Sequence, residues 1–333
     1  MRITYLFRSP GTGHSIEELF KAVQPEVDRL ADIQTRIVRL PHISHGLYQV
    51  WQNLWSLRGL SADVFHITGD VHYAALALPA SRTVLTIHDC SLLKKNRHYP
   101  IRYALFWLFW YYLPIRWAKR VTVVSITTQQ ELTHYLGRIA HKAVVIPNGY
   151  DPAFVFQPNA FRKAQPILLQ VGTAPNKNLP RLLTAIDGMP CTLVIVGPLT
   201  DAIIQKLAQH RIEYQSYQNI SRTKIIQLYA DCDIVTFVST YEGFGMPVLE
   251  ANAVGRAVIT SDIAPLSELA NGAAYLVDPT DVAAIRRGIL ELIQDDTYRQ
   301  TLIDRGKQNA QRYTIARTAA HYATLYTEMA EVA

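Results

Sequence analysis

The sequence predicts an α/β protein with two doubly wound, Rossmann-like domains, each built on a parallel sheet. Its 333 residues are 49% hydrophobic and 18% charged, a length and composition suited to two ordinary globular cores. Short β-branched runs, bounded by Gly, Pro, Asp or Asn, alternate with stretches of helical periodicity. This alternation predicts parallel sheets with helices on both faces.

The expected strands form two sets. The first comprises Arg2–Phe7, Thr35–Leu40, Val64–Ile67, Thr83–Ile87, Arg120–Val124 and Ala143–Ile146. The second comprises Ile167–Val171, Thr192–Val196, Asp233–Val238, Ala257–Thr260 and Ala274–Val277. Turn-forming residues from Pro147 to Gln165 separate the sets, which predicts domains over 1–160 and 161–313. The final segments, Thr297–Tyr313 and Thr314–Val332, are expected to be helices.

Charge and cysteine content narrow the possible partners. The net charge of +6 and the pI near 9.1 allow an anionic partner, such as a phosphorylated ligand or a membrane surface. No basic-aromatic module of the nucleic-acid-binding type and no zinc-finger spacing is present, so a nucleic-acid partner is not expected. Cys90, Cys191 and Cys232 lie far apart without a C-x-x-C pair, which suggests neither disulfides nor a zinc site and favours a cytoplasmic location. No run has the length of a signal peptide or of a membrane-spanning helix.

The segment from Asp233 to Ala251 contains the most informative motif. A strand-like run is followed by a turn with Gly243 and Gly245, and Pro247 suits the first turn of the next helix. A helix N-terminus favours a phosphate or pyrophosphate, because its amides lack partners and its dipole end is positive. Glu242 and Glu250, eight positions apart, would instead accept hydrogen bonds from hydroxyl groups. A nucleotide-sugar has this chemistry, because its pyrophosphate lies between two groups that carry diols.

This E-x7-E pattern, within E-G-F-G-x-P-x-x-E-A, resembles the retaining glycosyltransferases of the GT-B fold, family 4. An isolated E-x7-E would fit an ordinary strand–turn–helix unit with surface acids equally well. The resemblance implies a metal-independent, retaining transfer of a hexose from a UDP- or GDP-linked donor to a hydroxyl of a glycan or lipid-linked acceptor, with no cofactor. It also implies that the last helix, 314–333, crosses back to the first domain.

Several segments of the second half match the family in order. Gly172–Leu179 resembles the family's G-x-x-x-x-K-N loop, whose lysine, here Lys177, contacts the donor pyrophosphate. Thr173 and Asn176 stand where many relatives carry arginines, so more of the stabilisation would fall to Lys177 and the helix end. Asn219 lies in the loop where relatives hold the nucleotide base. The pyrophosphate is expected to contact backbone amides of Gly243, Phe244, Gly245 and Met246.

The first half has two candidate segments. Ser9–Ser15, with Gly11 and Gly13, resembles the glycine turn beside the donor phosphates, although a capping box of Ser15 with Glu18 explains part of it. A dinucleotide fingerprint is excluded, because position 16 is isoleucine and no acid ends the second strand. Thr86–Asp89 matches the family's H-D at the cleft, where His88 would reach the transferred sugar beside Asp89.

The resemblance assigns these residues to one mechanism. Glu250 would bind the ribose, Glu242 the sugar hydroxyls and Lys177 the pyrophosphate, and domain closure would bring His88 over the sugar. His88, Lys177 and Glu242 are thus the candidate catalytic residues. Two alternatives stay open, a nucleotide-sugar epimerase of the same fold and a non-catalytic sugar- or membrane-binding adaptor.

Residues 94–120 combine basic and aromatic side chains. The uncharged core Tyr103–Ile115 would be about 20 Å long as a helix, shorter than the ~30 Å hydrocarbon core of a bilayer. Aromatic residues flanked by Lys and Arg are typical of an interfacial helix. Two interpretations follow: a helix packed on the first sheet, or a surface that contacts the anionic inner face of a membrane.

Overall fold

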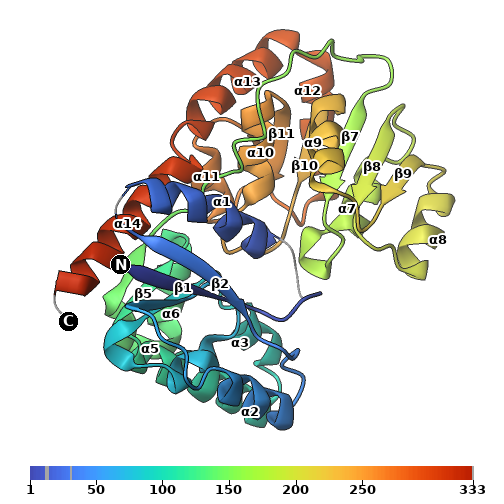
Figure 1. The fold of residues 1–333 in the computed structure, drawn as a ribbon. Helices are drawn as coiled ribbons and strands as arrows, with labels where there is room; N and C mark the ends of the chain where they lie inside the picture. The colour runs from blue at the N-terminus through green and yellow to red at the C-terminus, as the bar shows by residue number, and fades with distance from the viewer. Residues whose placement is uncertain (12–14, 31, 332–333) are drawn as a thin grey trace. The chain divides into compact units, whose positions relative to one another are not determined.

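The computed structural model describes residues 1–11, 15–30 and 32–331, and it contains two six-stranded sheets covered by helices (Figure 1). Every paired strand in both sheets runs parallel to its neighbours. The predicted fold class is therefore confirmed. All eleven predicted strands are present, and none of their ends is displaced by more than one residue.

The first sheet has the strand order β2-β1-β3-β4-β5-β6. Its strands are β1 (Arg2–Phe7), β2 (Gln34–Arg39), β3 (Val64–Ile67), β4 (Thr83–Ile87), β5 (Arg120–Val123) and β6 (Ala143–Val145). The α-helices of this half are α1 (Ser15–Leu30), α2 (Leu47–Ser56), α3 (Ser91–Asn96), α4 (Pro100–Phe106), α5 (Leu113–Trp117), α6 (Ile126–Leu136) and α14 (Ile315–Glu331). Shorter turns are the 3₁₀ helices η1 (His72–Ala77), η2 (Ala80–Arg82) and η4 (Gly137–Lys142) and the π-helix η3 (Trp107–Tyr112).

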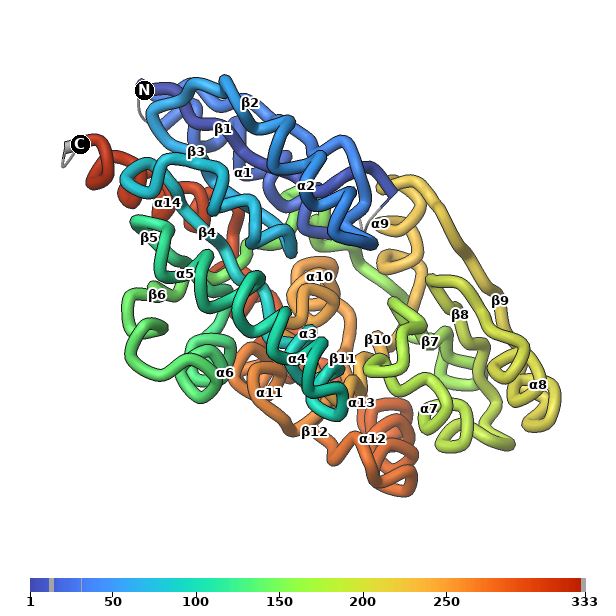
Figure 2. The backbone as a smooth tube through the Cα atoms, turned by 90° about the horizontal axis from the view of Figure 1, so that it is seen from below, coloured from blue at the N-terminus to red at the C-terminus, as the bar shows by residue number. Residues whose placement is uncertain are grey.

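Alternate residues of the first sheet face two separate apolar layers. Tyr5 and its neighbours on one face pack with α1 and α14, which lie side by side (Figures 1 and 2). Leu6 and the opposite face pack with α2, η1, η3 and α6. The C-terminal helix thus covers the first sheet, as the resemblance implied.

The second sheet has the strand order β12-β11-β10-β7-β8-β9. Its strands are β7 (Ile167–Val171), β8 (Thr192–Val196), β9 (Glu213–Tyr217), β10 (Ile234–Phe237), β11 (Ala257–Ser261) and β12 (Tyr275–Val277). Its helices are η5 (Pro175–Lys177), α7 (Leu179–Ala185), α8 (Asp201–Gln209), α9 (Arg222–Asp231), α10 (Met246–Val254), α11 (Leu266–Ala270), α12 (Val282–Gln294) and α13 (Asp296–Ala310). The prediction lacked β9, because this edge strand has mostly exposed residues and no apolar run to mark it.

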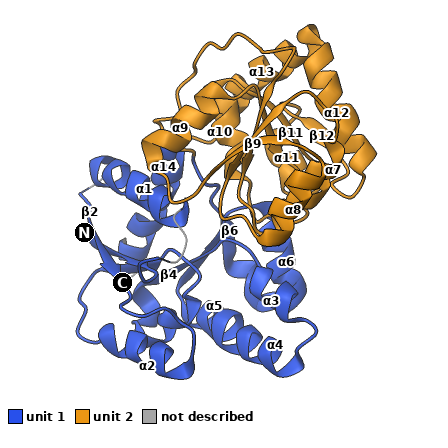
Figure 3. Cartoon of the chain, turned by 90° about the vertical axis from the view of Figure 1, so that its right-hand side faces the viewer, with its two compact units in different colours: residues 1–149, 315–333 blue, residues 150–314 orange. Residues whose placement is uncertain are grey.

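The chain divides into unit 1, residues 1–149 and 315–333, and unit 2, residues 150–314 (Figure 3). The segment around the expected boundary at residue 160 packs on unit 2. Arg162 forms an ion pair with the buried Asp233 at 3.0 Å, and Asn159 Nδ2 donates to Asp233 Oδ1 at 3.0 Å. Phe154 lies edge-on to the Tyr229 ring, with 5.1 Å between centroids. The change of unit therefore comes directly after Gly149.

Candidate active site

The motif around Glu242 forms a strand, a turn and a helix in unit 2. β10 ends at Phe237, and α10 begins at Met246 directly after Gly245. Gly245 has φ +127°, and a Cβ at this position would lie 2.5 Å from Leu266 Cδ2, so both backbone and space require glycine. Among the described residues, no side chain caps the N-terminus of α10. This helix end therefore keeps the amides and the positive dipole that favour an anion.

Lys177 and Glu242 form an ion pair beside this turn. Lys177 Nζ lies 2.6 Å from Glu242 Oε1 and 4.6 Å from the centroid of the Phe237 ring. The side chains are only 20% and 13% exposed, which makes the attraction stronger than that of a surface pair. A phosphate bound near Lys177 would compete with Glu242 for the ammonium group. The Glu242 carboxylate would then be available to hydroxyl donors.

The loop that carries Lys177 is fastened to the β10 loop by two asparagines. The buried Asn178 has φ +60°, and its Nδ2 donates to the carbonyl oxygens of Val238 (2.9 Å) and Pro279 (2.6 Å). The Asn176 side chain donates to Tyr241 O at 2.9 Å. The role of Asn178 was not predicted from the sequence. The feature of the sequence that could have indicated this role is an asparagine directly before the start of a helix, because asparagine tolerates a positive φ.

Gly172 and Thr173 shape the same loop. Gly172 has φ +90°, and a Cβ there would lie 3.0 Å from Lys177 Cε, so the glycine leaves room for the lysine stem. Thr173 Oγ1 donates to Pro198 O at 2.7 Å. Thr173 thus ties the loop to the segment that follows β8.

Glu250 lies inside α10, almost fully buried. Tyr229 donates its hydroxyl to Glu250 Oε2 at 2.6 Å, and Arg222 Nη1 lies 3.8 Å from Oε1. Burial raises the pKa of Glu250, whereas the Tyr229 hydrogen bond and the charges of Arg222 and Lys177 lower it. Burial and the charge of Glu250 raise the pKa of Tyr229, a hydrogen-bond partner of Glu250 that the sequence did not reveal.

Two further predicted residues of unit 2, Asn219 and Phe244, differ in burial. Asn219 is exposed, with φ +53°, in the loop between β9 and α9. Phe244 is 7% exposed, and its ring lies edge-on to Tyr313 with 6.0 Å between centroids. The Phe244 side chain therefore stabilises the turn, and a substrate contact at this position would involve the backbone.

In unit 1, His88 follows β4 and is buried. Its Nε2 lies 2.8 Å from Thr68 O; because a carbonyl only accepts, Nε2 carries the proton and Nδ1 is the acceptor nitrogen. Burial lowers the pKa of His88, so the ring is neutral at neutral pH. Asp89 accepts a hydrogen bond from Ser91 N at 2.7 Å and so supports the start of α3.

Gly11 has φ +83° and open space around the position of a Cβ. Gly13 lies outside the described residues. An ion pair between Arg8 and Asp70 (3.2 Å) joins the segments that follow β1 and β3. The negative charge of Asp70 raises the pKa of His88 and so opposes part of the effect of burial. The sequence analysis did not find this pair, because it joins residues far apart in the chain.

Two family models match adjoining parts of the chain. The model described as Glycosyltransferase Family 4 matches residues 5–154, and the model described as Glycosyl transferases group 1 matches residues 153–309. The chain belongs to the group 1 glycosyltransferases of the GT-B fold. It is accordingly a glycosyltransferase.

Curated proteins similar in sequence to this glycosyltransferase include a mannosyltransferase and a glycogen synthase. The chain is 27% identical over 288 residues to the O-antigen chain mannosyltransferase B of Escherichia coli. This match covers 78% of this chain and 73% of the relative. It is also 27% identical over 194 residues to a glycogen synthase of Mycobacterium tuberculosis, but this match spans only 47% of that protein.

Solved structures share the fold of this glycosyltransferase at low sequence identity. Anabaena Alr3699/HepE, solved with UDP and glucose, matches with a TM-score of 0.79 and 20% identity over 98% of this chain and 100% of that one. Sucrose-phosphate synthase from Thermosynechococcus elongatus matches with a TM-score of 0.81 and 15% identity over the whole of both chains.

Residues 94–120 of this glycosyltransferase run from the end of α3 through α4, η3 and α5 to the first residue of β5. Tyr111 and Ile115 are buried in the core of unit 1, and the indole N–H groups of Trp107 and Trp110 donate to backbone carbonyls. This half of the segment packs as a helix on the first sheet. No helix within the described residues is long and apolar enough to cross a membrane.

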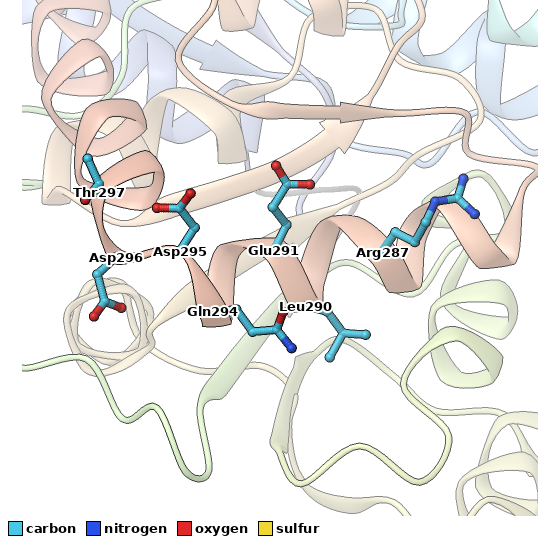
Figure 4. A pocket seen from close by; sticks show the side chains of 7 residues that line it. All are labelled: Arg287, Leu290, Glu291, Gln294, Asp295, Asp296 and Thr297. Atoms are coloured by element: carbon cyan, nitrogen blue, oxygen red, sulfur yellow. The ribbon is translucent and has the colours of Figure 1, made fainter.

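A surface hollow of unit 2 lies along the end of α12 and the start of α13 (Figure 4). Its acidic side chains already have local partners. Glu291 accepts from the Tyr275 hydroxyl at 2.9 Å, Asp295 accepts from Tyr298 N at 2.8 Å, and Asp296 pairs with Arg299 at 2.7 Å. None of the predicted site residues lines this hollow.

Proposed function

We propose that this glycosyltransferase moves a hexose from a nucleotide-diphosphate sugar to a hydroxyl group, with retention of configuration and without a metal ion. The supporting observation is the Lys177–Glu242 pair, 2.6 Å apart, beside the N-terminus of α10. Lys177 and the helix end supply positive charge for a departing nucleoside diphosphate. Glu242, once separated from Lys177, accepts hydrogen bonds from the sugar.

Glu250 and His88 have complementary roles in this proposal. Glu250, held by Tyr229, accepts hydrogen bonds from the ribose hydroxyls. His88, neutral and protonated on Nε2, offers Nδ1 as an acceptor to the transferred sugar. Asn219 contributes through its loop to holding the nucleotide base.

The donor we propose is UDP- or GDP-linked. A structural neighbour was solved with UDP-glucose, and several curated relatives are named mannosyltransferases, so glucose and mannose are the first hexoses to test. The proposed acceptor is a hydroxyl of a glycan or a lipid-linked acceptor, reached on the cytoplasmic side of a membrane. The basic-aromatic segment 94–120 is the surface proposed to contact that anionic membrane.

Glu242→Ala tests the assignment. Removing the carboxylate should lower transfer by at least about 100-fold, because the lost contact acts on the reacting sugar, while nucleotide binding persists through Glu250 and the end of α10. Transfer is measured as nucleoside diphosphate release with acceptor, and binding by calorimetry. Glu268→Ala, an exposed acid in α11, is the matched control. Full transfer by Glu242→Ala would refute the role.

The donor itself is identified by thermal shift with UDP-, GDP-, ADP- and dTDP-sugars. A true donor raises the melting temperature at concentrations well above its Kd. A shift with UDP- or GDP-sugars is expected. Stabilisation by ADP- or dTDP-sugars alone would contradict the proposed donor.

A further inference from the structure

Helix α2 presents an aromatic face to solvent. Leu47, Tyr48, Trp51 and Trp55 are 87%, 65%, 54% and 54% exposed. Their spacing of three and four residues places them on one side of the helix. Large apolar side chains gathered in this way mark a binding surface, whereas singly scattered ones do not.

The opposite side of α2 is anchored, so its aromatic face cannot turn inward. The buried Asn53 accepts a hydrogen bond from His42 N (3.0 Å) and donates to His42 O (2.8 Å) and to the Tyr73 hydroxyl (2.8 Å). Val50 and Leu54 pack against the core of unit 1. The aromatic face is therefore a fixed feature of the surface.

The rings of this face cover one another. Tyr48 and Trp51 are stacked, with 6.1 Å between centroids and an interplanar angle of 21°, and Trp51 and Trp55 are 5.6 Å apart at 34°. The Arg58 guanidinium lies 3.8 Å from the centroid of Trp55. Each of these rings thus contacts a neighbouring ring, while more than half of the surface of each residue stays exposed. The ring edges with a neighbouring guanidinium match the boundary between lipid headgroups and acyl chains.

A second apolar stripe lies at the same end of unit 1. Ile101, Leu105 and Phe109 of α4 and η3 are 77%, 50% and 40% exposed. Tyr73 of η1 connects the two helices: its hydroxyl bonds to Asn53 of α2, and its ring lies 4.8 Å from that of Trp110 in η3. Figure 3 shows α2 and α4 along the lower edge of unit 1 in that view.

The charge of this region favours an anionic surface. Residues 41–120 contain nine Lys or Arg against three Asp, a surplus equal to the +6 of the whole chain. Lys95, Arg97 and Arg102 are exposed and take part in no carboxylate pair within the described part of the chain. Basic side chains beside interfacial aromatics are the combination that binds anionic lipid headgroups.

We propose that the aromatic face of α2, together with the stripe on α4 and η3, docks this protein on an anionic phospholipid surface. Tyr48, Trp51 and Trp55 enter the headgroup boundary, while the basic side chains contact the phosphates. The inference rests on the membrane partner proposed above. It adds α2, which that proposal did not include, as the element that inserts its aromatic side chains, and it leaves the second apolar stripe to residues 94–120.

The test uses the full chain and phosphatidylcholine vesicles with or without about one third phosphatidylglycerol. We expect salt-sensitive co-sedimentation with the anionic vesicles only, and quenching of tryptophan fluorescence by brominated lipids. Trp51→Ser/Trp55→Ser should lower the partition coefficient at least about 10-fold and abolish most of the quenching. Ile204→Ser/Tyr214→Ser, which changes exposed apolar residues of unit 2, should change neither.

Other outcomes separate the alternatives. Equal partitioning of wild type and Trp51→Ser/Trp55→Ser overturns the inference. If Ile101→Ser/Phe109→Ser alone abolishes binding, the membrane partner stands and the role of α2 fails. Quenching by a soluble oligosaccharide instead of vesicles, or a dimer that Trp51→Ser/Trp55→Ser converts to a monomer, would also overturn it. Donor-induced thermal shifts, measured in parallel, report the proposed reaction independently.

Discussion

Glu250 shows how one buried carboxylate can be held ready for hydroxyl ligands. Burial alone would favour its neutral form, which accepts hydrogen bonds poorly. The Tyr229 hydroxyl at 2.6 Å, assisted by Arg222 at 3.8 Å, partly offsets this cost. The pKa of Glu250 still stays above its ordinary value, because desolvation is the largest effect.

Tyr229→Phe should therefore change the pH dependence of donor binding. The wild type loses affinity as the pH falls through the raised pKa of Glu250. Without the Tyr229 hydroxyl, which lowers this pKa, the loss should occur at a higher pH. The free energy of unfolding of the variant at neutral pH should also be about 1–3 kcal/mol lower than that of the wild type, since the lost hydrogen bond involves a charged group. Calorimetric Kd values across pH and urea unfolding check both effects.

Tyr214→Phe provides the control, because this tyrosine lies on an exposed edge strand. Superimposable pH profiles for wild type and Tyr229→Phe would show that Tyr229 does not tune Glu250. The sequence identified Glu250 through its spacing from Glu242. It could not identify Tyr229, because the bond joins residues 21 positions apart through tertiary packing.

The elements of unit 2 are joined at the active-site edge by the loop after β7. Asn178 donates to carbonyls of the loops that follow β10 and β12, and Asn176 reaches Tyr241. These bonds fix the distance between the loop of Lys177 and the loop of Glu242. The geometry of the Lys177–Glu242 ion pair thus depends on hydrogen bonds from the two asparagine side chains to backbone carbonyls.

Asn178→Ala should release this connection. It leaves two buried carbonyls without their donor and places alanine, which disfavours this conformation, at a positive φ. The free energy of unfolding should therefore be about 2–4 kcal/mol lower than that of the wild type. Asn178→Gly removes the same hydrogen bonds but accepts φ +60°, and it should recover about 1 kcal/mol of this loss. Both variants should bind the nucleotide-sugar more weakly. Urea unfolding and calorimetry measure these changes; wild-type stability in both variants would contradict the role.

Strands buried on both faces could be predicted from the sequence, whereas exposed elements could not. β4 has five buried residues in a β-branched run, and its predicted bounds match. β9 has mostly exposed residues, so its pairing with β8 is visible only in the sheet. Likewise, the aromatic face of α2 carried no family motif. Its exposure depends on Asn53, whose partners come from other elements.

At the scale of the whole molecule, the C-terminal helix links the ends of the chain. Tyr326 of α14 lies 2.6 Å from Nδ1 of His66, which is 260 positions earlier. His66 Nε2 in turn lies 2.6 Å from Thr86 Oγ1, so the ring is fixed on both sides. The family resemblance implied that α14 covers the first sheet. The bond itself could not be predicted, since a periodic pattern gives the face of a helix but not its partner.

Three buried histidines should make unit 1 sensitive to acid. Burial lowers the pKa of His66 to about 3 and also lowers those of His72 and His88. Below the ordinary histidine pKa of about 6.5, the unfolded chain binds protons that the folded unit excludes, so stability falls as pH falls. The slope should approach at most about 4 kcal/mol per pH unit while all three rings stay neutral.

Tryptophan fluorescence isolates this effect, because all five tryptophans lie in unit 1. Urea unfolding followed by fluorescence should show a marked loss of stability between pH 7 and pH 5. His72→Gln removes one of the three proton-linked groups and should lower the pH slope by about one third, which follows from the same linkage relation. His141→Gln, at an exposed position, should leave it unchanged. Equal fluorescence-detected stability of the wild type at both pH values would show that these histidines do not control the acid unfolding of unit 1.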